Sequence, residues 1–313
     1  MHMSGLEKMI RLRGGINQLG FNGLITRLIH WVDAGNATLT SAPLRFPVFK
    51  PARVAVTTDG FTPAHIVCPS PANPLQFPSF FEPCPSYSSN TTEFWGNFIS
   101  RDVLFVFDEI RRLTELLDTT PRTSMQEIER MNLSDSLSIV ERKSLSFTLT
   151  PASARNQRES SPEVDAQDLI SECCSLAALI YVHLSLRGVA VSSVVIDRLA
   201  SRLKSRLELF RDLVAAWHVA PRILTWILVT GAIASLDRPE RSWFVPHLAD
   251  LCEAFGLRYW EDLKEWLRSF LFLESGNEGR IRKVWEEVDE FMGDLEALGV
   301  GKSDFGVPLE DWA

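Results

Sequence analysis

A small group of residues combines positive charge with aromatic rings, which makes it the part of this sequence best suited to bind a ligand. His218 and Arg222 are one helical turn apart beside Trp217 and Trp226, and Pro221 lies between them. A cation or an imidazole next to aromatic rings can line a pocket for a small molecule. His218, Arg222 and Trp226 are therefore the first candidates for a small-molecule site.

Glu172 and His183 are a second candidate pair. They lie on one predicted helix, about three turns apart, and project from nearly the same side of it. A polar pair that faces a cavity could recognise an effector, whereas the same pair on an exposed helix surface needs no function. His30 has two similar interpretations, a ligand or base, or a histidine at the partly exposed edge of a helix. No residue is assigned to catalysis, and the candidates for ligand binding are His218, Arg222, Trp226, His183 and Glu172.

The common signatures of catalytic and metal sites are missing from the sequence. It contains no G-x-x-x-x-G-K-[ST] phosphate loop, no G-x-G-x-x-G dinucleotide motif, no G-x-S-x-G nucleophile elbow and no H-E-x-x-H zinc motif. The five cysteines share no short metal-ligand spacing, and the six histidines are scattered singly. We therefore expect no cofactor, no bound metal and no enzymatic activity.

The composition is that of a globular protein, since 45% of the 313 residues are hydrophobic and 23% are charged. The net charge of −8 disfavours contact with phosphate backbones, which require a basic face. The odd number of cysteines indicates a reducing compartment. The N-terminus has no apolar signal-peptide core, and we expect no stretch long enough to span a bilayer, which predicts a soluble, intracellular protein without a membrane partner.

The apolar spacing predicts an all-α fold, an irregular bundle of about nine or ten helices. Its centre is the segment 221–275, which holds four of the nine tryptophans and opens with a nearly continuous apolar run. Other helices are predicted over 93–118, 124–147, 164–187, 192–217 and 281–298. Near the N-terminus, a helix from about Gly23 has His30 and Trp31 beside its predicted core face, which is formed by Leu24, Ile25, Leu28, Ile29 and Val32.

Helix ends and one charged row also stand out in the sequence. Ser124 and Glu127 have capping-box spacing, and Ser192 or Ser193 is expected to cap the helix predicted over 192–217. A basic row on that helix could contact phosphate, but the acidic residues around it favour a solvated face; the row consists of Arg198, Arg202 and Arg206.

Two segments interrupt the helical pattern. Residues 42–92 hold ten of the seventeen prolines together with six phenylalanines, which predicts an extended segment laid over the helical body. This long Pro-rich loop could cover a groove as a lid or be only an elaborated connection. Residues 148–165 are polar with two prolines, which predicts a mobile surface loop or a hinge.

Three blocks of the sequence resemble a known family of regulators. They are RLRGGINQLGFNGLITRLIHWVDAGNA (residues 11–37), ISECCSLAALIYVHLSLRG (residues 170–188), and WILVTGAIASLDRPERSWFVPHL, which is followed by FLFLES and KVWEEVDEF. In this order they are similar to the fungal-specific transcription factor domain, the helical regulatory region found downstream of a binuclear zinc cluster. The resemblance spans nearly the whole chain and implies a single helical domain over residues 1–313.

The sequence departs from that family in one respect. The relatives carry a six-cysteine zinc cluster with an adjacent basic run, and neither is present here. The resemblance therefore implies a nuclear regulatory module that acts through a protein partner or a homodimer, with scope for a small-molecule effector and with no direct binding of nucleic acid. The alternative is a small-molecule-binding accessory protein or an enzyme of a fungal metabolic gene cluster, with a pocket between the central helices.

Overall fold

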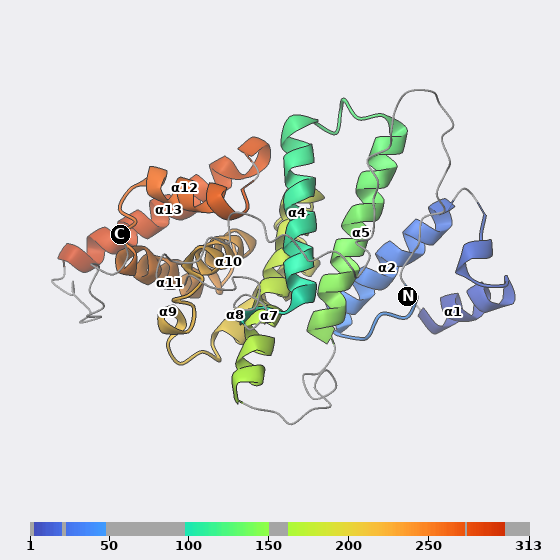
Figure 1. Cartoon of the computed structure of the whole chain (residues 1–313), viewed down its shortest axis with the longest axis horizontal. Helices are drawn as coiled ribbons and strands as arrows, with labels where there is room; N and C mark the ends of the chain where they lie inside the picture. Colours follow the sequence, from blue (N-terminus) through green and yellow to red (C-terminus); the bar gives the residue numbers. More distant parts are fainter. Residues whose placement is uncertain (1–2, 21–22, 48–97, 150–161, 273, 298–313) are drawn as a thin grey trace, which may run out of the picture.

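The computed structural model describes residues 3–20, 23–47, 98–149, 162–272 and 274–297, and within these ranges every regular element is a helix (Figure 1). The all-α, irregular bundle is thus confirmed, with eleven α-helices in the described part where nine or ten were predicted. In chain order the elements are α1 (Met3–Leu12), the 3₁₀ turn η1 (Ile16–Gln18), α2 (Leu24–Thr40), α4 (Arg101–Thr119), α5 (Glu127–Leu149), α7 (Pro162–Tyr181), the π turn η3 (Val182–Leu186), α8 (Val194–Leu207), α9 (Leu213–Ala216), α10 (Pro221–Ala234), α11 (Arg241–Ala254), α12 (Trp260–Phe270) and α13 (Glu274–Ala297).

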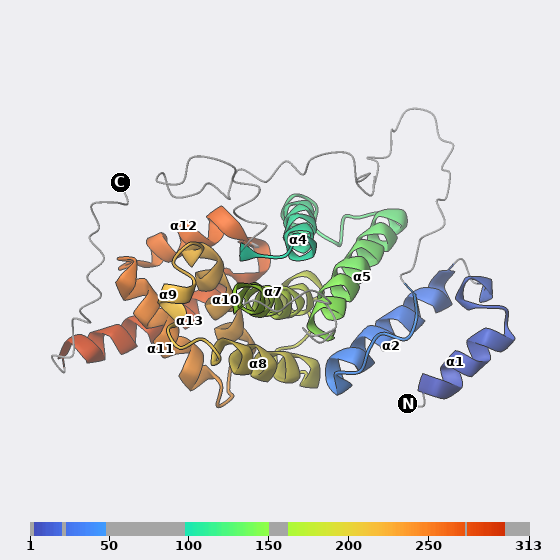
Figure 2. The ribbon, with the colours of Figure 1, turned by 60° about the horizontal axis from the view of Figure 1, so that its bottom comes forward.

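The α7 helix is the hub of the bundle. It contacts α4, α5, α8 and α10, and Figure 2 shows it nearly end-on between them. Residues 170–182 are all buried, as the broad apolar composition of this stretch requires. The window Ala166–Leu186 is long and apolar enough to cross a membrane, so the expectation that no stretch is long enough was wrong. Because 89% of that window is buried inside the protein, it is a core helix.

The C-terminal helices α10 to α13 form the other half of the core, drawn in orange and red in Figure 1. Helix α10 is buried on nearly all sides, as its nearly continuous apolar run requires. Its Trp226 packs edge-on against Phe107 of α4 and Phe270 of α12, with ring centroids 5.7 and 5.4 Å apart. One turn later Gly231 brings the α10 backbone against the Phe244 ring of α11. Large aromatic rings therefore join α4, α10, α11 and α12 into one core.

Local signals in the sequence explain several helix ends. The Ser193 hydroxyl caps α8 by accepting a hydrogen bond from the Val195 N–H, which confirms the predicted N-cap. The predicted capping box of Ser124 and Glu127 does not form. Instead the Ser124 hydroxyl donates to the Pro121 carbonyl oxygen, and α5 begins at Glu127 itself.

Helix α12 ends against α4. The Arg111 guanidinium of α4 donates to the carbonyl oxygens of Phe270 and Ser269, at 2.5 and 3.4 Å. These carbonyls belong to the last turn of α12, where no intrahelical donor is available. The cation also complements the negative end of the helix dipole.

The structure revises or leaves open three of the segment boundaries that the sequence predicts. The helix predicted over 192–217 is two helices, because Asp212 accepts a hydrogen bond from the Ala215 N–H and starts α9 anew. The predicted loop 148–165 is narrower, since Thr148 and Leu149 end α5 and Pro162 begins α7; residues 150–161 lie outside the described part. Of the Pro-rich segment 42–92, only residues 42–47 are described, and they contain no helix or strand. The single domain over residues 1–313 stays a prediction.

Candidate functional site

The first three candidate residues do not form a common site. His218 is exposed just after α9, and its Nδ1 atom lies 2.7 Å from the Ala215 carbonyl oxygen. Arg222 is exposed in the first turn of α10, with its guanidinium 5.8 Å from the centre of the Trp266 ring. Trp226, in contrast, is 2% exposed in the core. The cation and the imidazole thus face solvent, whereas the indole faces inward.

The second pair is also separated. Glu172 of α7 is buried and accepts a hydrogen bond at 3.0 Å from Arg206 of α8. His183 of η3 is half-buried, and its Nδ1 atom lies 3.5 Å from a carboxylate oxygen of Glu141 on α5. Each residue is therefore engaged with a different neighbouring helix.

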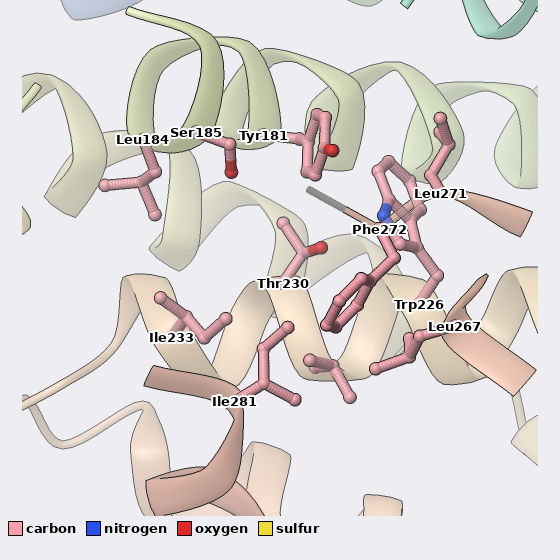
Figure 3. A pocket seen from close by; sticks show the side chains of 11 residues that line it. Tyr181, Leu184, Ser185, Trp226, Thr230, Ile233, Leu267, Leu271, Phe272 and Ile281 are labelled. Carbon is pink, nitrogen blue, oxygen red and sulfur yellow. The ribbon is translucent and has the colours of Figure 1, made fainter. Parts of the chain in front are cut away.

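A cavity lies between the end of α7, η3, α10, α12 and α13, and Trp226 is the one sequence candidate that lines it (Figure 3). Its volume is about 20 Å³, enough for one or two water-sized groups. The wall is apolar except for a few hydroxyl groups and the indole nitrogen. The lining residues are Tyr181, Leu184, Ser185, Trp226, Val229, Thr230, Ile233, Leu267, Leu271, Phe272 and Ile281.

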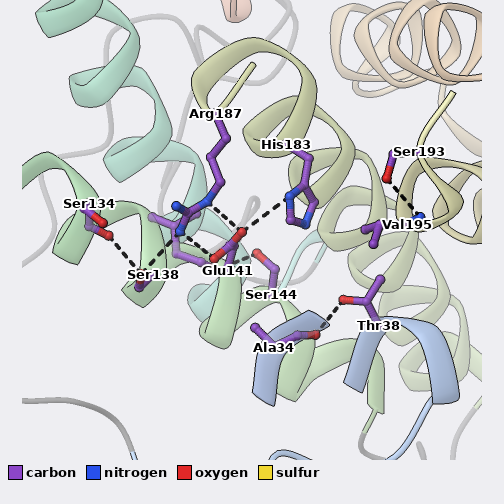
Figure 4. A network of polar contacts seen from close by, with 11 residues as sticks. Ala34, Thr38, Ser134, Ser138, Glu141, Ser144, His183, Arg187, Ser193 and Val195 are labelled. Atoms are coloured by element: carbon purple, nitrogen blue, oxygen red, sulfur yellow. Dashed lines mark hydrogen bonds and ion pairs between the residues drawn. The ribbon is translucent and has the colours of Figure 1, made fainter. Parts of the chain in front are cut away.

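A polar cluster on the other side of α7 holds η3 against α5 (Figure 4). The buried Glu141 carboxylate accepts two hydrogen bonds from Arg187, at 2.8 and 2.7 Å. Arg187 also donates to the Ser138 hydroxyl at 3.2 Å. Burial lowers the pKa of His183, although the neighbouring Glu141 charge opposes that shift. His183 is therefore neutral near pH 7, and Arg187 is the partner that balances Glu141.

A second buried ion pair fixes α2. Asp33 of α2 lies 3.1 Å from Arg142 of α5, and both are almost completely buried. The Asp33 carboxylate also accepts hydrogen bonds from the backbone N–H groups of Arg45 and Phe46. Arg142 donates in addition to the Phe46 carbonyl oxygen. Since each charge is paired and hydrogen-bonded, this cluster has a structural explanation.

The exposed surface of α2 is apolar. Leu24, Leu28 and Trp31 follow one another at spacings of four and three residues and are 56%, 53% and 58% exposed. The other exposed residues of the helix are Leu39 and Thr40. Four polar side chains of the same helix are buried instead, namely Thr26, His30, Asp33 and Thr38. We call Leu24, Leu28, Trp31 and Leu39 the α2 apolar stripe.

The sequence predicted the opposite orientation for part of this helix. Leu24 and Leu28 were expected in the core and are exposed, and His30 was expected at a partly exposed edge and is buried. Asp33 explains the difference, because its partners on α5 and in residues 45–46 turn the polar face inward. A helix that buries polar groups and exposes large apolar ones is informative, since such surfaces mark interaction sites.

Metal and thiol chemistry find no support in the described residues. No group of three or more His, Cys, Asp or Glu side chains there could hold a metal ion. Cys173, Cys174 and Cys252 are buried thiols, and burial raises the pKa of each. They are therefore protonated at neutral pH and behave as small hydrophobic residues. Cys68 and Cys84 lie outside the described residues.

Comparison with known proteins gave one result. The model of the family described as the fungal specific transcription factor domain matches residues 1–290. No curated protein and no solved structure matches the chain.

Proposed function

The chain belongs to the fungal specific transcription factor domain family, and on that premise we propose that it is a helical regulatory module that acts by pairing with a second copy of itself. The observation that carries the proposal is the α2 apolar stripe. Large apolar side chains exposed in a row on one helix favour a contact with another helix. Nuclear localisation is part of the same proposal, by resemblance to the family.

A second copy fits this surface better than an unspecified protein for two reasons. The exposed residues of α2 carry no charge, so two copies can bring the same patch together about a two-fold axis without repulsion. The net charge of −8 makes like molecules repel one another over the rest of the surface, so two copies would meet at this uncharged patch. The spacing of four and three residues along the stripe is that of a helix face that interdigitates with a partner helix.

Contact with DNA is not part of the proposal. The net charge is −8, and the sequence holds no six-cysteine cluster. The basic row of α8 is partly used inside the protein, because Arg206 pairs with Glu172 and Arg202 donates to the Thr148 carbonyl oxygen. We also propose that the module has no enzymatic activity, in keeping with a regulatory family.

Light scattering on the purified protein over a range of concentrations tests the pairing. We expect a dimer for the native sequence and a monomer for Leu28→Glu, because the dimer would bury a carboxylate in an apolar contact. Leu209→Glu is the matched control: Leu209 is 60% exposed and lies outside α2, so this variant should remain a dimer. Circular dichroism establishes that each variant is folded.

Two results would refute parts of the proposal. A native protein that is monomeric at every concentration would exclude a second copy as the partner of the stripe. Tight, salt-dependent binding in a DNA titration of the same sample would show that the basic row was misjudged.

A further inference from the structure

The cavity beside α7 contains a buried hydrogen-bond donor that the protein leaves unused. The Trp226 side chain is 2% exposed, and among the described residues its Nε1–H group has no hydrogen-bond partner. An indole N–H can only donate. Leaving such a donor buried without an acceptor is unfavourable, because the group has lost its hydrogen bond to water. An acceptor from outside the protein would recover that free energy.

The geometry directs this donor into the cavity. Figure 3 shows the nitrogen edge of the Trp226 indole turned toward the space between Tyr181, Thr230 and Phe272. Thr230 lies four residues after Trp226 on α10, hence on the same helix face, and its hydroxyl points into the same space. The cavity thus offers one donor and one hydroxyl that can donate or accept, on an otherwise apolar wall.

Trp217 provides an internal comparison. It is also fully buried, and its Nε1–H also has no partner among the described residues. Like the Trp226 ring, its ring packs edge-on against two phenylalanines, here Phe98 and Phe210, but it does not line the cavity. An unpaired indole N–H by itself therefore carries no inference, and the combination of donor, hydroxyl and open volume distinguishes Trp226.

We propose that this cavity is a binding site for a small neutral molecule of two heavy atoms, one of them oxygen, of the class of methanol or formaldehyde. The oxygen accepts from Trp226 Nε1–H and exchanges a hydrogen bond with the Thr230 hydroxyl. The carbon atom contacts the apolar wall formed by Leu267, Leu271 and Ile281. No charged side chain lines the cavity, so burying an ionised ligand there would be unfavourable.

The size of the cavity sets the size of the ligand. A volume of about 20 Å³ admits one or two water-sized groups, which excludes larger effectors in this arrangement. Water has the same hydrogen-bonding chemistry and is the competing occupant. The site goes beyond the proposed pairing of α2 and does not depend on it, because the cavity lies among α7, α10, α12 and α13.

Nuclear magnetic resonance of the nine ¹⁵N-labelled tryptophan side chains tests this site in the full chain. The Trp226 Nε1–H signal is assigned as the one that disappears in Trp226→Phe. If that variant does not fold, the signal is assigned as the one that Thr230→Val shifts most. On titration with methanol we expect a saturable downfield shift of this signal alone, as a new hydrogen bond forms. In Thr230→Val the dissociation constant for methanol should rise about tenfold, which is the loss of one hydrogen bond.

Xenon is the matched apolar probe, since it can fill the space but cannot accept a hydrogen bond, and it should cause no downfield shift of that signal. Two results would overturn the proposal. In one, all nine indole signals drift linearly with the methanol concentration, which indicates a solvent effect. In the other, the Trp226 signal does not change with methanol and shows magnetisation transfer to water, which leaves water as the sole occupant.

Discussion

Replacing Gly231 with alanine tests how closely α10 and α11 pack. A β-carbon built on Gly231 would lie 2.6 Å from Cζ and 2.7 Å from Cδ1 of Phe244, and it would also collide with Cε1. Real β-carbons keep a larger distance, so the ring must move. Phe244 is fully buried and packs edge-on against Trp243, with ring centroids 5.1 Å apart, so the ring has little room to do so.

Two effects of opposite sign set the size of the change. Overpacking a well-packed core typically costs about 1–3 kcal/mol. Alanine in a helix interior is better than glycine by about 1 kcal/mol. The difference predicts that Gly231→Ala lowers the free energy of unfolding by about 0–2 kcal/mol.

Urea unfolding followed by circular dichroism at 222 nm measures this difference. Gly279→Ala is the control, because Gly279 lies inside α13 with no atom within 4 Å of the added carbon. The control should gain roughly 0.5–1 kcal/mol from helix propensity alone. If Gly231→Ala gained as much stability as the Gly279→Ala control, the close contact between Gly231 and Phe244 would be refuted.

Three further predictions concern the charged and capping residues. Arg142→Met should lower the free energy of unfolding by about 3–5 kcal/mol in urea titrations, because it leaves the buried Asp33 carboxylate without its cation. Burial, aided by the Arg142 charge, lowers the pKa of His30 to about 4. As the pH falls below about 6.5, His30 takes up a proton in the unfolded chain but stays neutral in the folded protein. The free energy of unfolding should therefore fall by up to about 3 kcal/mol between pH 7 and pH 4. Unfolding titrations at both pH values should show a smaller fall in His30→Gln. Ser193→Ala should cost about 1 kcal/mol through loss of the α8 cap, whereas Ser192→Ala should leave the urea midpoint unchanged.

Local chemistry made much of the fold predictable. The α10 helix was predictable because proline suits the first turn and the following residues are nearly all apolar. A serine cap at the start of α8 was also predictable from local sequence, since the Ser193 hydroxyl needs only a backbone N–H two residues ahead. The break between α8 and α9 was not predictable. The apolar residues of the two helices keep a helical spacing across Asp212, and only the Asp212 cap marks the start of a new helix.

The orientation of α2 could not be predicted because it depends on groups far along the chain. Leu24, Leu28 and Trp31 form one face, and Thr26, His30 and Asp33 form the opposite face at the same spacing. Hydrophobicity alone puts the first face in the core. The second face is buried instead because Arg142, more than a hundred residues later, supplies the counter-charge for Asp33. A single sequence does not reveal that pairing.

The candidate ligand residues failed to assemble for a related reason. His218 and Arg222 flank the start of α10, where their side chains reach solvent, whereas Trp226 lies one turn deeper. Aromatic composition located the cavity-lining indole. It did not locate Thr230 or Tyr181, because hydroxyl groups inside apolar helices carry no distinctive spacing.

The π turn at the end of α7 is a position where the chain could lose one residue and keep its fold. The Arg187 N–H donates to the Val182 carbonyl oxygen at 2.8 Å, five residues back, so the turn holds one residue more than an α-helix would. In a regular helix, losing one residue rotates every later side chain by about 100°. Within Val182–Leu186 the same loss would tighten the turn into an α-helix and leave the direction of the following chain nearly unchanged. Relatives that lack one residue in this region can therefore share the fold, and an alignment should place the gap there.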